Sequence, residues 1–281
     1  MPMATRDLTI KHTGFNRISF TEPIRWNNLR VWVMLLPAIR QTPWIVILCS
    51  VGWIVELSRS EADEPALLEL VGDRGLQAWR KPTGDWIVAA AALPDPAHTN
   101  RLTAEPGQGT LINGVTGKTR NLLTSEDFGD VDAHFEFLIP KGSNSGVKFE
   151  GLYEIQIIDS FGIAKPDGHH CGGIYPRAEL LPKYHYLDEG TPPLLNAARP
   201  PGEWQTLDVV FRAPRFDSSG KKIKNARFDN VVLNGQVIHR NVELKTPTGH
   251  YWRNKEVERG PILLQGDHGP VAFRNIRVRP L

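Results

Sequence analysis

The chain has 281 residues, 41% of them hydrophobic, and its 33 basic and 31 acidic residues give a formal net charge of +2. This length and hydrophobic content suffice for a large buried core, so a globular domain is predicted. The globular part holds no block of Lys and Arg long enough to follow a phosphate backbone, which argues against nucleic acid as a partner. High contents of Gly (25) and Pro (22) favour short strands joined by turns over a helical fold.

Residues 1–62 differ in character from the rest of the chain. An apolar run at residues 44–55 follows Arg40 and precedes Ser60 and Ala62, two small residues separated by one position. This is the order of a signal peptide, and the run is short for a membrane span. We therefore predict an N-terminal leader.

The part of the chain before the apolar run is long for a leader, and a start of translation at Met34 would give the leader a conventional length. The mature domain is then expected to span residues 63–281 and to be exported to the periplasm or the extracellular space. The alternative is a retained N-terminal anchor, and only in that case does the sequence place the protein at a membrane.

The chain has two cysteines, Cys49 and Cys171. Removal of the leader would remove Cys49, so no intrachain disulfide is expected. Cys171 follows His169 and His170 in "DGHHCGGIY", which raises the hypothesis of a metal site. Adjacent residues on one strand cannot all face the same ion, and no second cluster with ligand spacing follows. The better interpretation is a buried small thiol, with no metal and no cofactor.

From residue 63 onward the chain reads as a succession of short strands, with a short helix conceivable only around residues 67–71. Gly, Pro, Asn and Asp bound the predicted strands, which are, in chain order, "DWIVAAAAL", "GTLIN", "VDAHFEFLIP", "GVKFEGLYEIQIID", "WQTLDVVFRAP", "ARFDNVVLNGQVIHR", "PILLQGD" and "VAFRNIRVRP". Asn234-Gly235 supplies the two positive-φ residues that a tight hairpin requires. The pattern predicts an all-β fold, a two-sheet antiparallel jelly-roll sandwich.

A long segment without strand pattern interrupts this succession at residues 162–202. It is rich in Gly, Pro, Tyr and charged residues, and its aromatic content argues against disorder. Loops of this length in a compact domain are usually functional. We expect it to fold over the sheet that carries Glu154 and Gln156.

The segment "YEIQIIDS", residues 153–160, alternates in polarity. Its apolar residues fall on one face of a strand, whereas Glu154 and Gln156 fall on the other, with Asp159 just beyond. Solvated surface is the usual meaning of such alternation. The floor of a site is the alternative that the neighbouring long loop favours.

Several motifs occur in the order in which one known family has them. "GDWIV", "EDFGDVDAHFEFLIPKGSNSGVKFEGLYEIQIIDSFG", "CGGIYPRAE", "NAARPPGEWQTLDVVFRAPRFD" and "GPILLQGDHGPVAFRNIRVRPL" resemble the 3-keto-disaccharide hydrolase family, from about Leu68 to Leu281. The resemblance implies a concanavalin A-like jelly roll of the lectin and glucanase type. It also implies an enzyme that cleaves 3-keto-glycosides, which a separate sugar 3-dehydrogenase supplies.

A ketone at C3 changes the chemistry of a glycoside. It acidifies the hydrogen at C2, so a base can remove this proton, the aglycone can leave from C1, and water can then add for net hydrolysis. Such a site needs a base near C2, an acid near the glycosidic oxygen, and donors near the ketone oxygen.

The candidate residues follow from the alternation of side chains along the strands, from the predicted turns and from the resemblance. We expect either His268 or Glu154 to serve as the base, and the other of the two, or Asp159, to serve as the acid. The candidate substrate-binding residues are Lys148, Gln156, Gln265, Asn144, Arg177 and Asp267.

Each candidate has a structural alternative. His268 would simply occupy a hairpin turn, Lys148 and Glu150 would form a surface ion pair, and Arg177 would pin the long loop to itself.

Two other classes of function stay open. The spacing of Glu154, Gln156 and Asp159 parallels the pattern of retaining glucanases on the same broad fold, although Gln156 stands where that pattern has a carboxylate. This fold also hosts carbohydrate-binding modules without catalytic activity.

Overall fold

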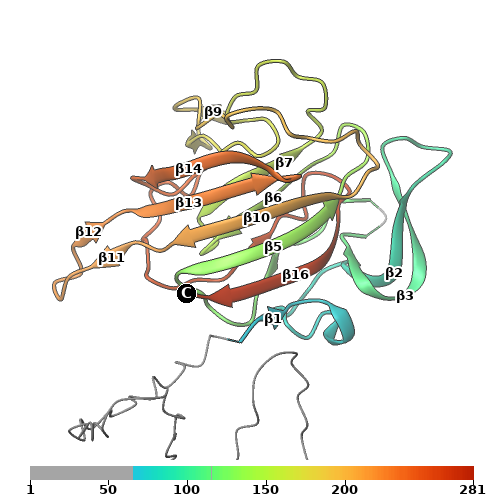
Figure 1. Ribbon diagram of the computed structural model, residues 1–281, viewed down its shortest axis with the longest axis horizontal. Helices are drawn as coiled ribbons and strands as arrows, with labels where there is room; N and C mark the ends of the chain where they lie inside the picture. Colours follow the sequence, from blue (N-terminus) through green and yellow to red (C-terminus); the bar gives the residue numbers. More distant parts are fainter. Residues whose placement is uncertain (1–65, 115) are drawn as a thin grey trace, which may run out of the picture. The chain divides into compact units, whose positions relative to one another are not determined.

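The computed structural model describes residues 66–114 and 116–281 (Figure 1). The predicted leader, its cleavage site and the alternative start at Met34 lie outside the described residues. Within the described ranges, no helix is long and apolar enough to cross a membrane. Where a short helix was conceivable, around residues 67–71, the chain forms the short strand β1 (Leu68–Glu69) instead. The 3-10 helix η1 (Gly72–Arg74) follows it and is the one helix in the described residues.

Two antiparallel sheets form the sandwich. The larger sheet has the order β14-β13-β10-β5-β16-β3-β2, with β1 paired to β16 (Figure 1). Its other strands are β2 (Ile87–Pro94), β3 (Leu102–Ile112), β5 (Val131–Leu138), β10 (Gln205–Arg212), β13 (Ala226–Leu233), β14 (Gln236–Leu244) and β16 (Ala272–Pro280). The smaller sheet has the order β4-β15-β6-β7, with β4 (Leu122–Leu123), β15 (Leu263–Leu264), β6 (Asn144–Phe149) and β7 (Tyr153–Ile158). The prediction of an all-β antiparallel jelly-roll sandwich is confirmed.

The core fills the space between the two sheets. Every second residue of β5 and β10 is buried, which is the pattern of strands with one face toward a core. Phe149 of the smaller sheet stacks on Phe211 of the larger one at a ring-centroid distance of 5.1 Å and meets Phe228 edge-on at 5.6 Å. These aromatic contacts fix the smaller sheet, and with it the strands that carry the polar candidates, against the larger sheet.

The predicted tight hairpin lies between β13 and β14. Asn234 and Gly235 have φ angles of 52° and 78°, and Leu233 pairs with Gln236 across the turn. The prediction from the Asn-Gly dipeptide is confirmed.

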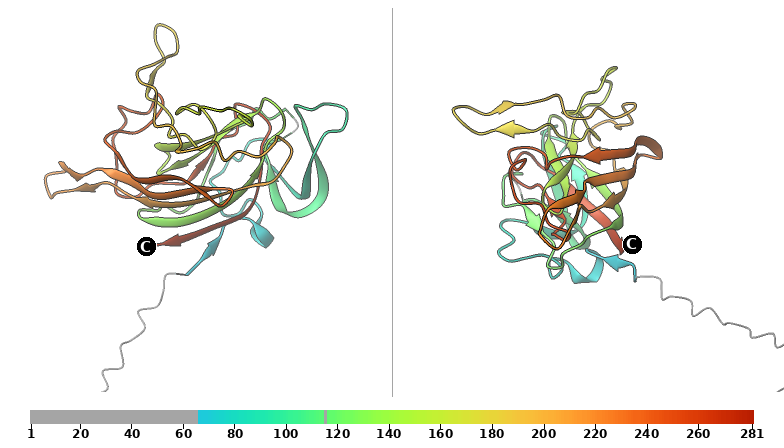
Figure 2. Two further views of the ribbon diagram at one scale, coloured as in Figure 1. Left: turned by 45° about the horizontal axis from the view of Figure 1, so that its top comes forward. Right: turned by 90° about the vertical axis from the view of Figure 1, so that its left-hand side faces the viewer.

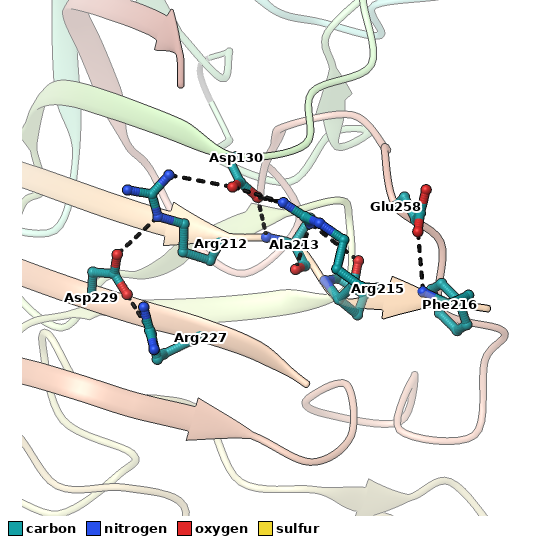
Figure 3. Close-up of polar contacts among 9 residues, drawn as sticks. Asp130, Arg212, Ala213, Arg215, Phe216, Arg227, Asp229 and Glu258 are labelled. Atoms are coloured by element: carbon teal, nitrogen blue, oxygen red, sulfur yellow. Dashed lines mark hydrogen bonds and ion pairs between the residues drawn. The ribbon is translucent and has the colours of Figure 1, made fainter. Parts of the chain in front are cut away.

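A charged network ties the ends of several strands together (Figure 3). Arg212 Nε lies 2.9 Å from Asp229 Oδ2, and Arg215 Nη2 lies 2.8 Å from Asp130 Oδ1. Arg227 also pairs with Asp229. The network anchors the small hairpin of β11 (Arg215–Phe216) and β12 (Lys222–Lys224), which extends from the larger sheet.

The long segment at residues 162–202 is irregular except for one small hairpin, β8 (Ala178–Glu179) and β9 (His185–Tyr186). Figure 2 shows this hairpin projecting beyond the body of the sandwich. Residues 172–175 of the same segment lie alongside β7, because Ile174 forms an antiparallel bridge with Ile155. The loop therefore extends the smaller sheet, at the strand that the sequence predicted it would cover.

Candidate active site

Two paired strands form the floor of the site. β6 and β7 run antiparallel, with Lys148 opposite Glu154 and Gly146 opposite Gln156. Lys148, Glu154 and Gln156 point away from the core, because side chains alternate between the two faces of a strand. Lys148 Nζ lies 3.0 Å from Glu154 Oε2, and the side chains are only 5% and 2% exposed. The floor thus carries a buried ion pair.

The opposite face of β7 is core. Tyr153, Ile155 and Ile157 are at most 1% exposed, as the alternation predicted. The polar face is also shielded from solvent, because Glu154 and Gln156 are only 2% and 3% exposed. The long loop continues the sheet beyond β7, where Gln156 N donates to Gly173 O at 2.9 Å. The polar face is therefore not open solvated surface.

Gly146 leaves the space that the Glu154 carboxylate occupies. A Cβ atom at residue 146 would lie 2.4 Å from Glu154 Oε1. The Glu154 backbone is held on both sides: its N donates to Thr248 Oγ1 at 3.0 Å, and its O accepts from Tyr175 N at 3.2 Å. The carboxylate is therefore fixed in position before any ligand binds.

A cavity of about 400 Å³ lies over this floor. Its lining residues are Asn144, Lys148, Glu154, Gln156, Tyr175, Leu180, Tyr184, Tyr186, Gly249, His250, Gln265 and His268. Asn144 Oδ1 is buried and has no hydrogen-bond partner within the described residues. Buried polar groups are normally paired, so this oxygen is available to a ligand hydroxyl. The volume and the convergent polar groups fit a small-molecule site.

Two histidines on the cavity wall differ in their electrostatic surroundings. His268 Nδ1 lies 2.6 Å from Asp267 Oδ1, and this hydrogen bond raises the pKa of His268 above its usual value, against the opposing effect of burial. For His250, burial and then the nearby Lys148 ammonium lower the pKa. His250 is therefore biased toward the neutral form and His268 toward the protonated form, which suits a base or hydrogen-bond acceptor beside an acid.

The structure brings together most of the predicted site residues. Those that line the cavity are Glu154, His268, Lys148, Gln156, Gln265 and Asn144. Asp267 stands behind them as the partner of His268 rather than as a lining residue.

Two predicted residues lie outside the lining. Asp159 Oδ2 accepts a hydrogen bond from Gly142 N at 2.9 Å, so its carboxylate stabilises a turn. Arg177 Nε lies 2.7 Å from Asp188 Oδ2, which ties one part of the long loop to another. For Arg177 the geometry agrees with the structural alternative stated from the sequence.

The structural alternative of a surface ion pair between Lys148 and Glu150 is wrong, because Lys148 pairs with Glu154. Glu150 sits in the turn after β6 with φ at 55° and is 5% exposed. Both of its carboxyl oxygens are buried without a hydrogen-bond partner in the described part of the chain. Burial, reinforced by the Glu256 carboxylate, raises the pKa of Glu150 to about 9, so this side chain is a neutral acid at pH 7.

Cys171 is buried, as predicted, at 1% exposure, and burial raises the pKa of its thiol to about 11. The adjacent histidines turn elsewhere: His170 Nδ1 lies 2.7 Å from Asp167 Oδ1, and the His169 ring packs on Tyr186. Among the residues that the structure describes, no group of three or more His, Cys, Asp or Glu side chains is arranged to hold a metal ion.

Sequence reasoning missed His250 and the aromatic part of the lining. His250 is a single histidine in a loop between β14 and β15, and no repeating pattern marks it. Tyr175, Tyr184 and Tyr186 come from the long loop, where the local density of tyrosine was visible in the sequence. That density was a usable signal, because Tyr combines a flat apolar ring with a polar end.

The jelly roll and its polar cavity define a carbohydrate-active β-sandwich protein. The chain belongs to the family described as the 3-keto-alpha-glucoside-1,2-lyase-like domain, which matches residues 69–279. The resemblance seen in the sequence motifs is thereby confirmed.

Solved structures support the same fold. A protein from Parabacteroides distasonis ATCC 8503, provisionally named a glycosyl hydrolase, is 26% identical, with a TM-score of 0.57 over 76% of this chain and 84% of that one. A second provisionally named glycosyl hydrolase from the same organism is 18% identical, with a TM-score of 0.50 over 77% of this chain and 100% of that one. No curated protein matches the chain.

Proposed function

We propose that this protein cleaves the glycosidic bond of 3-keto-glycosides by removing the proton at C2, eliminating the aglycone and adding water. The observation that carries the proposal is the ion pair of Lys148 and Glu154 on the floor of the cavity. C2 and the C3 ketone are adjacent atoms, so the base and the group that stabilises the enolate oxygen must also be neighbours. A carboxylate oxygen 3.0 Å from an ammonium nitrogen meets this requirement.

In the elimination, Glu154 takes the C2 proton, and the C2–H electrons form an enolate whose oxygen faces Lys148. The enolate then reforms the ketone, a C1–C2 double bond forms, and the C1–O bond breaks. His268 protonates the departing oxygen, a role that its raised pKa supports.

In the hydration, the two proton transfers are reversed on a new molecule. Neutral His268 takes a proton from water as the water oxygen bonds to C1, and protonated Glu154, whose carboxyl proton exchanges with solvent between the two half-reactions, protonates C2. The product is the free 3-keto sugar, and both side chains are restored. Gln156, Gln265 and Asn144 supply hydrogen bonds to the sugar hydroxyls.

The geometry favours this chemistry over an ordinary retaining glycosidase. That mechanism needs two carboxyl groups facing the glycosidic bond. Glu154 is the one carboxylate among the described residues that line the cavity, since Asp159 is bonded to Gly142 N and Gln156 is an amide. The provisional name of the Parabacteroides relative, together with the family, supports a carbohydrate-cleaving enzyme over a binding module.

The test is release of the aglycone from a 3-keto-glucoside, beside its unoxidised parent, in deuterated water. We expect turnover of the 3-keto compound alone, with deuterium at C2 of the sugar product, because C2 loses and regains a proton. Equal turnover of the unoxidised parent, or release without deuterium at C2, would indicate an ordinary glycosidase. Binding without turnover of either compound would indicate a carbohydrate-binding module.

The substrate requires an earlier reaction. Ordinary glycosides carry an alcohol at C3, so a separate sugar 3-dehydrogenase must form the ketone before this enzyme acts. Export is part of the proposal, and N-terminal sequencing of the secreted protein that found a start near Asp63 would support it. Recovery of an intact Met1 or Met34 terminus in the membrane fraction would contradict it.

A further inference from the structure

Three tyrosines of the long loop form one connected group at the cavity, here called the tyrosine cluster: Tyr175, Tyr184 and Tyr186. Tyr175 Oη lies 3.2 Å from Tyr184 Oη and 3.0 Å from Tyr186 Oη. The rings of Tyr184 and Tyr186 meet edge to face, with centroids 5.5 Å apart. Two hydrogen bonds thus link the three hydroxyl groups, and most of the surface that the cluster offers a ligand is ring surface.

The tyrosine cluster packs against the rest of the long loop on one side and is exposed to solvent on the other. The His169 ring packs on Tyr186 with centroids 4.1 Å apart. Even so, Tyr184 and Tyr186 are 42% and 46% exposed, and the neighbouring Leu180, also in the lining, is 54% exposed. Large apolar side chains left uncovered beside a polar cavity are a feature of binding sites.

The burial of the catalytic candidates sets the direction in which a substrate lies. Lys148 and Glu154, at the ketone and C2 in the proposed mechanism, are at most 5% exposed and form the floor. His268, which protonates the oxygen on C1, has a 52% exposed side chain and stands toward solvent. The sugar therefore lies with C2 and C3 down and its C1 oxygen toward the mouth, so the aglycone reaches the exposed part of the lining.

The polarity of this exposed part of the lining determines which aglycones it can bind. The amides available for sugar hydroxyls, from Asn144, Gln156 and Gln265, belong to the floor strands or the turn beside them. From the long loop, the described lining receives three tyrosines and Leu180, and most of their surface is apolar. A second sugar would find only the tyrosine hydroxyls as partners for its many hydroxyl groups there, whereas a flat aromatic ring needs no hydrogen-bond partner.

We propose that the tyrosine cluster is the subsite for the leaving group and that it selects 3-keto-glycosides with an aromatic aglycone. This inference rests on the proposed function and specifies its substrate class. Tyr184 is the ring most suited to a test, because it is exposed and its loss removes no core packing.

The experiment compares phenyl and methyl 3-keto-glucosides, in both anomeric forms, with the full chain and its Tyr184→Ala and Tyr184→Phe variants. For Tyr184→Ala we expect kcat/KM to fall about 3- to 10-fold for the phenyl compound, the range of one lost aromatic contact. The methyl compound should change less than about 2-fold, because it does not reach the ring. Tyr184→Phe should keep the preference, since it keeps the ring. Taking each ratio within one substrate removes the difference in leaving-group acidity.

Phe161→Ala is the matched control. Phe161 is an aromatic residue that is 55% exposed just before the same loop but does not line the cavity, so neither substrate should be affected. Equal losses on both substrates in Tyr184→Ala would overturn the subsite while leaving the proposed function intact. A 3-keto-disaccharide that is preferred to the phenyl compound and depends on Tyr184 would also overturn it, in favour of a second sugar subsite. Turnover of none of these compounds by the unsubstituted chain would overturn the proposed function and this inference with it.

Discussion

Replacement of Glu154 by Gln tests the proposed base and the ion pair on the cavity floor together. The change preserves shape but leaves the Lys148 ammonium, 5% exposed, without its partner. Breaking a buried ion pair from one side costs about 3–5 kcal/mol. We expect about 3 kcal/mol, at the low end of that range, because the pair lines a cavity with exposed side chains at its edge. For a domain of this size the loss corresponds to a melting temperature lower by about 6–12 °C.

Turnover should fall as well, by ~10²-fold or more, the range for a lost general acid or base. The double variant Lys148→Met with Glu154→Gln separates the two effects. It removes both buried charges, so stability should return toward that of the parent, whereas turnover should stay lost. The measurements are thermal unfolding and aglycone release from a 3-keto-glucoside.

Ile155→Ala is the control one position away on the opposite face. Ile155 is fully buried in the core, so its truncation should cost about 2–5 kcal/mol while the folded protein keeps its chemistry. The reasoning is refuted if Glu154→Gln keeps near-full turnover. A destabilised variant whose folded fraction is fully active would restrict Glu154 to holding Lys148 in place.

Three further predictions concern other parts of the molecule. Asp267→Asn removes the negative charge of the carboxylate whose hydrogen bond raises the pKa of His268, so the alkaline limb of the kcat/KM profile should move to lower pH; an unmoved limb would exclude His268 as the acid. Gly146→Ala places a Cβ 2.4 Å from Glu154 Oε1 and should reduce turnover far more than it reduces substrate binding, as measured by kcat against KM. Glu150→Gln should stabilise the fold at pH 7. The pKa of the Glu150 carboxyl is raised to about 9 in the folded protein, so its contribution to stability is full below the unfolded pKa and is lost as pH rises toward 9, whereas Gln does not titrate. The gain at pH 7 should reach about 3 kcal/mol by urea unfolding and vanish at pH 4, and a gain independent of pH would contradict it.

Much of the fold could be predicted because its signals are local. The alternation of β7 predicted that Glu154 and Gln156 share one face, since the period of a strand is two residues. The turn at Asn234-Gly235 was equally readable, since two adjacent positive φ angles admit few residue types.

The errors begin where local periodicity ends. β7 stops at Ile158, so parity no longer governs the direction of Asp159, whose carboxylate turns to Gly142 N instead. The ion pair suggested for Glu150 is wrong for a related reason. It follows the end of β6 in a turn, where a positive φ directs the side chain away from Lys148.

The partners within the cavity depend on the register of strands and on contacts between distant segments, which side-chain patterns alone do not determine. Lys148 meets Glu154 because the turn between β6 and β7 sets their register. His250 reaches the same cavity from a loop far along the chain, next to Thr248, whose hydroxyl accepts from Glu154 N. The contact of His250 could be found only with knowledge of which distant segments are neighbours.

The charges around the cavity bear on which transition state it stabilises. An ordinary glycosidase develops positive charge at C1, which carboxylates stabilise and cations oppose. Here the floor presents the Lys148 ammonium beside a single carboxylate, and the wall adds His268, whose pKa is raised toward the protonated form. The enolate pathway develops negative charge, first on the ketone oxygen and then on the departing oxygen, and these are the positions at which Lys148 and His268 stand in the proposed mechanism. The Lys148 ammonium, which would raise the barrier for an oxocarbenium ion, lowers it for an enolate, whereas an acid at His268 serves either pathway. The position of Lys148 therefore favours 3-keto-glycosides as substrates.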